Sequence, residues 1–197
     1  RRFINLPAAS IDAGIRYALG SLAAFMGASR GFVYRISPDG CVLWNTHEWS
    51  AEGTAPVIES LRRVPFESIP WWRGEVDRME DVRLIRIAAL PPEASNEQAI
   101  MVEQGVASLI VLPLRHAGKL FGFAGFDSDR EDHEWTEESA SLLRSIGGLL
   151  TSTIIRAEAE IVLEESERKH RQLVETLQEG IWTIDRDAIT TYVNPRM

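Results

Sequence analysis

The chain has 197 residues, 45% of them hydrophobic, and carries a formal net charge of −8. This composition supplies a sizeable core and excludes wholesale disorder, while the negative charge argues against a nucleic-acid-binding module, which usually has a basic patch. No apolar run approaches the ~20 residues of a membrane-spanning helix, the first residues do not resemble a signal peptide, and the single cysteine, Cys41, excludes an internal disulfide framework.

The first half of the chain predicts short helices and strands in alternation. Apolar residues at three- and four-residue spacing predict a helix over residues 10–27. Residues 31–36 and 41–49 predict an antiparallel hairpin around a Pro-Asp-Gly turn. The elements expected next are short helices at 57–62 and 66–79, a strand at 82–87, and a helix at 95–104 with Glu97 near its first turn.

A second hairpin, over residues 106–127, is the clearest local pattern. Two apolar runs at 109–114 and 120–126 flank a polar His-Ala-Gly-Lys turn, whose glycine supplies the positive φ that a tight hairpin needs. Gly122 and Gly125 interrupt the second run, which predicts a bulge or the close approach of another backbone or a ligand. The element order predicts an α+β fold, with an antiparallel sheet and helices on its faces.

The same region resembles a known family. The stretch GKLFGFAGFDS at 118–128, the acidic loop after it, the Trp-Thr-Glu-Glu motif at 135–138 and a long apolar helix together resemble the C-terminal half of a GAF domain. The resemblance covers residues 10–160 and is most specific over 105–150. GAF domains are small sensory modules of bacterial signalling proteins, and the resemblance implies the GAF fold.

The last predicted helix begins near Thr136 and continues to Leu177. Its apolar residues recur at threes and fours between charged ones, with a slip near residues 161–163, a pattern typical of a coiled coil with a stutter. A single amphipathic helix lying on its own domain is the alternative. We hypothesise a parallel homodimer through Leu143, Ile146, Leu150, Ile154, Ala157, Ile161, Leu173 and Leu177.

The tail resembles the opening of a PAS domain. Residues 167–175 fit the pattern Glu-Arg-x-x-Arg-x-Leu-Val-Glu, and strands at 181–184 and 189–193 are expected around an acidic turn. We therefore expect a piece of a longer protein. Its parts would be a GAF domain at 1–160, a coiled-coil linker at 161–178 and the first hairpin of a truncated PAS domain at 179–197.

No catalytic or metal site is predicted. Cys41 has no neighbouring histidine and is expected to be an inert, buried residue. Bilin-binding GAF relatives carry their cysteine beside a histidine in the later half of the domain, and nothing here matches. The four histidines lack the spacing of a metal site. His170 lacks the phosphoacceptor box of histidine kinases, so we expect no catalytic activity in this chain and no cofactor.

The tryptophans suggest a pocket for an unidentified small molecule. GAF domains that bind ligands hold them between the sheet and the helices that here fall in residues 57–104, and aromatic walls with a few polar groups are typical of such pockets. Plain core packing is the alternative, and the cyclic-nucleotide signature of some GAF domains is absent. The candidate ligand-binding residues are Trp44, His47, Trp49, Trp71, Trp72, Arg73 and Arg86.

These expectations together describe a regulatory module for sensing and dimerisation. The chain itself is expected in the cytoplasm, within a larger cytoplasmic or membrane-associated signalling protein. By resemblance, the most frequent parent is a sensor histidine kinase of a two-component phosphorelay, with the downstream PAS and output domains of the same chain as partners. The alternatives are a cyclic-dinucleotide synthase or hydrolase that carries the same module, or a GAF-fold photosensor or redox enzyme. No nucleic-acid partner and no membrane segment are expected within the chain.

Overall fold

The computed structural model describes residues 8–176, 180 and 182–193. The chain divides into two compact units, Arg1–Ile154 and Ile155–Met197. Within the described residues, no helix is both long enough and apolar enough to cross a bilayer.

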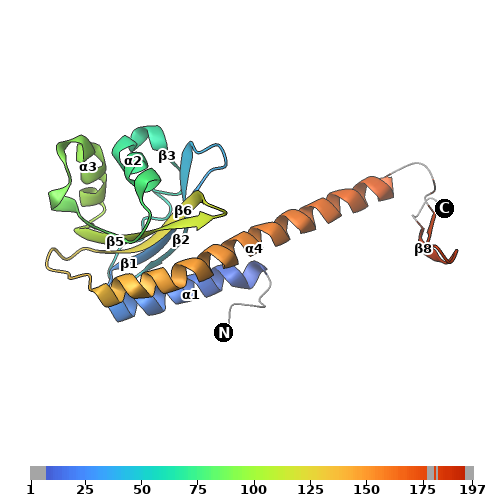
Figure 1. The fold of residues 1–197 in the computed structure, drawn as a ribbon, viewed down its shortest axis with the longest axis horizontal. Coiled ribbons are helices and arrows are strands. Elements are labelled where there is room, and N and C mark those ends of the chain that lie inside the picture. Colours follow the sequence, from blue (N-terminus) through green and yellow to red (C-terminus); the bar gives the residue numbers. More distant parts are fainter. Residues whose placement is uncertain (1–7, 177–179, 181, 194–197) are drawn as a thin grey trace. The chain divides into compact units, whose positions relative to one another are not determined.

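The first unit is built on one antiparallel sheet with the strand order β3-β2-β1-β6-β5-β4 (Figure 1). The two hairpins predicted from the sequence, β1–β2 and β5–β6, lie side by side because β1 pairs with β6. The strands are β1 (Arg30–Ile36), β2 (Val42–Ser50), β3 (Val64–Pro65), β4 (Arg83–Arg86), β5 (Ser108–His116) and β6 (Lys119–Ser128). The predicted antiparallel sheet is confirmed.

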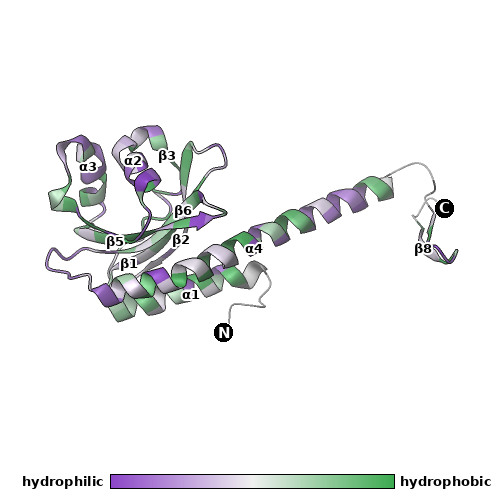
Figure 2. Cartoon of the chain, viewed as in Figure 1, coloured by the Kyte–Doolittle hydropathy of each residue, from purple (hydrophilic) through white to green (hydrophobic). Residues whose placement is uncertain are grey.

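Helices cover both faces of this sheet (Figure 1). On one face lie α1 (Ala8–Met26) and the first part of α4 (Glu137–Thr176); on the other lie α2 (Pro70–Arg78) and α3 (Ser95–Glu103). Three short 3-10 turns, at Phe66–Ser68, Ile87–Ala89 and Pro92–Ala94, connect the elements on the second side. Figure 2 shows hydrophobic and hydrophilic residues alternating along α4, as the amphipathic pattern of the sequence requires.

Two apolar layers form the core, one on each face of the sheet. Under α1, the buried side chains Ile11, Ile15 and Leu19 follow the predicted three-four spacing. The opposite layer lies between the sheet and α2, and it includes Phe32, Tyr34, Leu43, Phe66, Ile69, Trp72, Val76, Leu109, Val111 and Phe123.

The β5–β6 hairpin explains why glycines interrupt its second strand. Ala117 and Gly118 have φ values of 48° and 77°, the left-handed pair that a two-residue hairpin turn requires. A side chain at Gly122 would meet the carbonyl oxygen of Tyr34, and one at Gly125 would meet that of Ile110. The predicted close backbone approach is thus confirmed.

One predicted helix, at residues 57–62, is wrong. Residues 57–61 make only a single turn, closed by the bond from Leu61 N to Val57 O (2.9 Å). Glu48 on β2 accepts a bond from Val57 N at one end of this turn, and the Leu61 carbonyl accepts one from Asn45 N at the other. Both ends are therefore held against β2, which leaves no length for further helical turns.

The second unit continues α4 through Thr176 and ends in a hairpin of β7 (Trp182–Ile184) and β8 (Thr190–Val193). The carboxylate of Asp185 closes the turn, accepting hydrogen bonds from the backbone amides of Asp187 and Ile189, each at 2.9 Å. The side chains of both strands are exposed. Over the described residues, β7 and β8 agree with the strands predicted at 181–184 and 189–193.

Candidate functional site

A cavity of about 110 Å³ lies between the sheet and the helices α2 and α3. Strands β1, β2, β5 and β6 contribute its floor, and the β2–β3 segment contributes Val57 and Leu61. Most of its lining is apolar. Four aromatic and five charged or amide side chains distinguish it from ordinary core packing: Phe32, Tyr34, Trp72, Phe123, Arg30, Glu48, Glu97, Gln104 and Asp127.

The aromatic side chains form a continuous wall. The rings of Tyr34 and Phe123 stack with their centroids 5.0 Å apart, and Phe32 meets Tyr34 edge-on at 5.5 Å. Trp72 of α2 meets Phe123 edge-on, also at 5.5 Å. Edge-to-face and offset pairs at these distances are favourable and hold the rings in fixed orientations. The wall therefore joins the sheet to α2.

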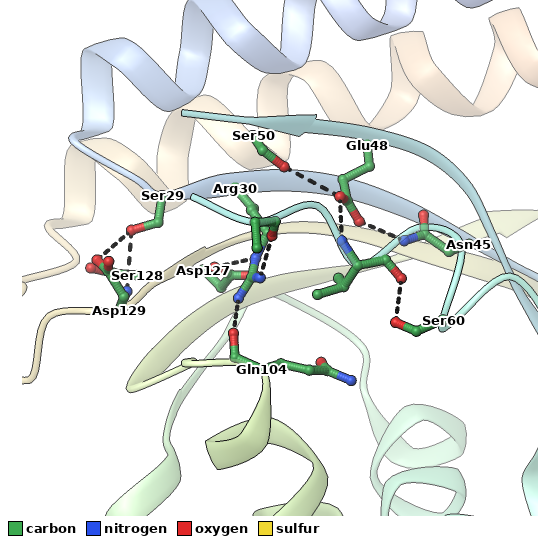
Figure 3. Close-up of polar contacts among 12 residues, drawn as sticks. Ser29, Arg30, Asn45, Glu48, Ser50, Ser60, Gln104, Asp127, Ser128 and Asp129 are labelled. Atoms are coloured by element: carbon green, nitrogen blue, oxygen red, sulfur yellow. Dashed lines mark hydrogen bonds and ion pairs between the residues drawn. The ribbon is translucent and has the colours of Figure 1, made fainter. Parts of the chain in front are cut away.

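A buried ion pair closes one end of the cavity. Figure 3 shows the guanidinium of Arg30 between the carboxylate of Asp127 and the backbone of Gln104. Arg30 Nε lies 3.0 and 3.1 Å from the two Asp127 oxygens, Nη2 donates to Gln104 O (2.9 Å), and Nη1 donates to Ala55 O (3.1 Å). One side chain thus joins the sheet, the end of α3 and the β2–β3 segment. Burial raises the pKa of Asp127 to about 6, although the attraction of Arg30 opposes this shift.

A second polar cluster surrounds Glu48 on β2 (Figure 3). Its carboxylate accepts hydrogen bonds from Asn45 Nδ2 (2.9 Å), Ser50 Oγ (3.2 Å) and Val57 N (2.9 Å), all of them neutral donors. Asn45 Nδ2 also lies 3.5 Å from the hydroxyl of Tyr34. Burial, and then the negative charge of Glu48, raises the pKa of Tyr34, so its hydroxyl stays protonated.

Glu97 of α3 is buried, with only 2% of its surface exposed. Its Oε1 accepts hydrogen bonds from the backbone amides of Trp71 (2.9 Å) and Trp72 (3.2 Å) in the first turn of α2. The residue at the N-cap position of α2 is Ile69, which has no polar side-chain atom, so Glu97 performs the cap from another helix. Its other oxygen, Oε2, has no hydrogen-bond partner among the residues that the structure describes.

Sequence reasoning missed the polar residues that line the cavity. It noted Glu97 only as a local feature of its own helix, and it did not single out Arg30, Glu48 or Asp127. A charged residue inside an otherwise apolar strand was the available signal, since such residues are rarely buried without a partner. Arg30 at the start of β1 and Asp127 near the end of β6 both fit that description.

Three of the predicted ligand residues lie on β2, and none of them lines the cavity. Trp44 is 39% exposed, and Trp49 packs against Gly20 of α1. His47 Nε2 lies 3.1 Å from Asp12 of the same helix, and burial lowers the pKa of His47. A shift in the β1–β2 register beside Val33 changes which side chains face the cavity, so Leu43 and Glu48 face it instead.

The other four candidates lie on α2 and β4. Trp72 lines the cavity, and Trp71 packs beside it with ring centroids 6.2 Å apart. Arg73 donates to Gly40 O and to Asp77 (2.8 Å), and its guanidinium lies over Phe66. Arg86 is exposed and donates to Glu131 O (3.2 Å). The structure thus brings Trp72 alone of the seven candidates into the cavity wall.

A model of the GAF domain family matches residues 12–154. The chain belongs to the GAF domain family. Its first unit, with the cavity between sheet and helices, is therefore a GAF domain. Among the described residues, no cluster of histidine, cysteine and acidic side chains has the arrangement of a metal site.

The chain is also similar to part of a signalling protein. The chain is 27% identical over 175 residues to the methanogenesis regulatory histidine kinase FilI of Methanothrix harundinacea, covering 82% of this chain and 18% of the relative. It thus spans less than a fifth of that protein's length.

Two solved structures share the fold. The phycoerythrobilin-bound GAF domain of a cyanobacterial phytochrome has a TM-score of 0.62 at 19% identity, covering 78% of this chain and 89% of that one. A bacteriophytochrome of the photosynthetic bacterium R. palustris has a TM-score of 0.65 at 16% identity, with 90% and 40% covered. At these identities the likeness concerns the fold alone.

The GAF domain does not fit a bilin of the kind bound by that first neighbour. Cys41, the single cysteine of the chain, does not line the cavity, and the prediction that it is buried is wrong, because it is exposed in the turn before β2. The cavity, at about 110 Å³, is also smaller than the roughly 300–1,000 Å³ pockets that hold drug-sized ligands. No thiol is thus placed to attach a chromophore there.

The predicted dimer residues differ in how deeply their side chains are buried. Leu143, Leu150 and Ile154 are buried inside the GAF domain, which fits the alternative of an amphipathic helix lying on its own domain. Ile146 is half-buried and lines a small cavity between α1 and α4. Ala157 is half-buried, and Ile161 and Leu173 are exposed by 47% and 65%. The remaining candidate, Leu177, lies outside the described residues.

Proposed function

We propose that this GAF domain senses a small molecule and regulates a histidine kinase of a two-component phosphorelay that belongs to the same polypeptide. The observation that carries the proposal is the cavity, which is lined by aromatic rings and contains a buried, partly unpartnered carboxylate. Plain core packing would fill such a space with side chains. The similarity to a regulatory histidine kinase supports the choice of output.

The proposed output path is helix α4. It begins in the GAF domain, where Leu143 is fully buried, and continues without interruption to Thr176. We place the parallel homodimer in its later part, around Ile161 and Leu173, because these apolar side chains are exposed. A PAS domain would follow in the cytoplasm, and two packings of the paired helices would transmit the state of the cavity.

A cavity-filling variant of the full-length protein tests the sensory role. Val106 is buried and lines the cavity, so Val106→Phe places a ring in the space that a ligand would occupy. Val102→Phe is the matched control, because Val102 lies on α3 with 61% of its surface exposed. We expect Val106→Phe to change the rate of autophosphorylation from ATP severalfold, while Val102→Phe leaves it unchanged. Equal rates in both variants, with native thermal unfolding, would contradict the proposal.

A further inference from the structure

The cavity wall carries more negative than positive charge. Three carboxylates, Glu48, Glu97 and Asp127, line it together with a single cation, Arg30. Arg30 forms its ion pair with Asp127. The hydrogen-bond partners of the other two carboxylates, Glu48 and Glu97, are neutral N–H or O–H donors in the part of the chain that the structure describes. Glu97 is buried and Glu48 half-buried, and buried charges in proteins are normally paired, so these two carboxylates have no cation of their own among the described residues that line the cavity.

Of these two carboxylates, Glu97 has the greater need of a further hydrogen-bond donor. Both bonds that it accepts from α2 use Oε1, and Oε2 is buried without a partner among the described residues. A buried acceptor left unsatisfied is costly, and such atoms in folded proteins are uncommon. A donor delivered by a ligand would satisfy it. The strongest donor for a carboxylate is a positively charged N–H group.

The other walls suit the same chemistry. Phe32, Tyr34, Trp72 and Phe123 present aromatic surface, which favours apolar groups and attracts cations to the ring faces. The cavity is less suited to an anion, because each of the three guanidinium nitrogens of Arg30 already donates a hydrogen bond, to Asp127, Ala55 O or Gln104 O. These bonds use three of the five guanidinium N–H groups, and Asp127 already balances the positive charge, so Arg30 offers a phosphate or carboxylate no unpaired cation.

We propose that the cavity binds a protonated primary amine on a compact apolar body, with the ammonium group directed to Glu97 and the body against the aromatic wall. This inference rests on the proposed sensory function and specifies its ligand class. The size is limited: an engineered apolar cavity of about 150 Å³ binds benzene, and the present one measures about 110 Å³. The body is therefore no larger than a single small ring.

Three probes of similar size and shape, which differ in charge, test this selectivity. Benzylamine is a cation at about pH 7, benzyl alcohol is neutral and benzoate is an anion. Isothermal titration calorimetry with the full chain should show benzylamine binding more tightly than benzyl alcohol by about tenfold or more, with benzoate weakest. Binding of benzyl alcohol or benzoate as tight as that of benzylamine overturns the inference.

Two variants of α3 test whether the charge of Glu97 is the one that selects the amine. Glu97→Gln keeps an acceptor oxygen for the α2 amides but removes the negative charge, so it should abolish the preference for benzylamine and leave the affinity for benzyl alcohol unchanged. Glu103→Gln removes the same charge from an exposed position on α3 and should change neither. An equal loss of benzylamine affinity in both variants would mean that the overall negative charge of the domain, and not Glu97 in particular, attracts the amine. This result overturns the assignment to Glu97.

The two proposals fail in different ways. If benzyl alcohol binds as well as benzylamine and Val106→Phe abolishes both, the cavity is a sensor site without amine selectivity. If no probe binds but Val106→Phe still changes autophosphorylation, the amine is wrong and the sensory function stands. If no probe binds and Val106→Phe changes nothing, both proposals are wrong.

Discussion

Arg30 and Asp127 face one another across the paired strands β1 and β6, with Nε 3.0 Å from Oδ2 and both side chains buried. The two residues are direct register partners, so the sheet itself fixes their approach. The remaining guanidinium nitrogens hold Ala55 and Gln104 from two other segments. One cross-strand pair therefore determines how the cavity is closed at this end.

Removing one partner of this pair should destabilise the domain strongly. Arg30→Met leaves a carboxylate buried without its cation, and we expect a loss of about 3–5 kcal/mol in the free energy of unfolding. The double variant Arg30→Met/Asp127→Leu should lose less than the sum of the single variants. Urea unfolding provides the measurement. The exposed pair Arg130–Asp132 is the control, and Arg130→Met should have little effect; equal losses at both sites would contradict the prediction.

The raised pKa of Asp127 predicts a pH dependence of stability. Burial shifts this pKa from 3.8 to about 6, so between these values the folded state binds the proton more tightly than the unfolded state. The contribution of Asp127 to stability is therefore fully present below the lower value and is lost as pH rises through the upper one. Its size is roughly 3 kcal/mol for a shift of about two units. The difference in unfolding free energy between the unmodified chain and Asp127→Asn should fall accordingly, and a flat difference would show that Asp127 titrates normally.

Glu97 should stabilise α2 although it belongs to α3. Glu97→Ala leaves the amides of Trp71 and Trp72 without their acceptor, and we expect a loss of about 1–3 kcal/mol. Glu97→Gln retains one acceptor oxygen and should lose less. Thermal unfolding followed by circular dichroism measures both variants. An Ala variant no less stable than the Gln variant would mean that these bonds contribute nothing.

Two neighbouring glycines of α4 should respond in opposite directions to the same substitution. Gly148 has open space around its Cα, so Gly148→Ala should stabilise the helix by about 0.5–1 kcal/mol. A methyl group at Gly147 would meet Leu112 Cδ2 of β5, so Gly147→Ala should gain less or destabilise the domain. Denaturant midpoints of the two variants give the comparison. A gain of the same size at both positions would show that α4 does not pack this closely on the sheet.

The proposed dimer predicts which apolar residues of α4 act between chains. Ile161→Asp with Leu173→Asp should convert dimers to monomers in sedimentation equilibrium without lowering the thermal stability of the GAF domain, because both side chains are exposed. Ile154→Asp should instead unfold the domain, since Ile154 is buried within it. A monomeric unmodified chain would reject the dimer.

Local patterns were sufficient for most of the fold. Alternation, turn glycines and three-four spacing are properties of neighbouring residues, and they located α1, both long hairpins and α4. The segment at 57–62 failed because its ends are hydrogen-bonded to β2, and such long-range contacts leave no trace in local propensity.

The cavity was harder to predict, for two physical reasons. The register shift beside Val33 exchanges the faces of β2, so the tryptophans chosen from that strand face away from the cavity. Glu97 acts on backbone amides 25 and 26 positions earlier in the chain, and only the folded structure brings these groups together. The structure has a cavity between the sheet and residues 57–104, but side chains other than the predicted ones line most of it, and ligand binding there stays a prediction.

The exposed position of Cys41 has a practical consequence. Because the chain has a single cysteine, one thiol-reactive dye would label the protein at one defined point without any substitution. The label would sit next to Gly40, whose carbonyl oxygen is held by Arg73 of α2, the residue that follows Trp72. In a variant that keeps Trp72 as its single tryptophan, a fluorophore at this turn would therefore report, by energy transfer from that indole, on any movement of α2 as the cavity fills.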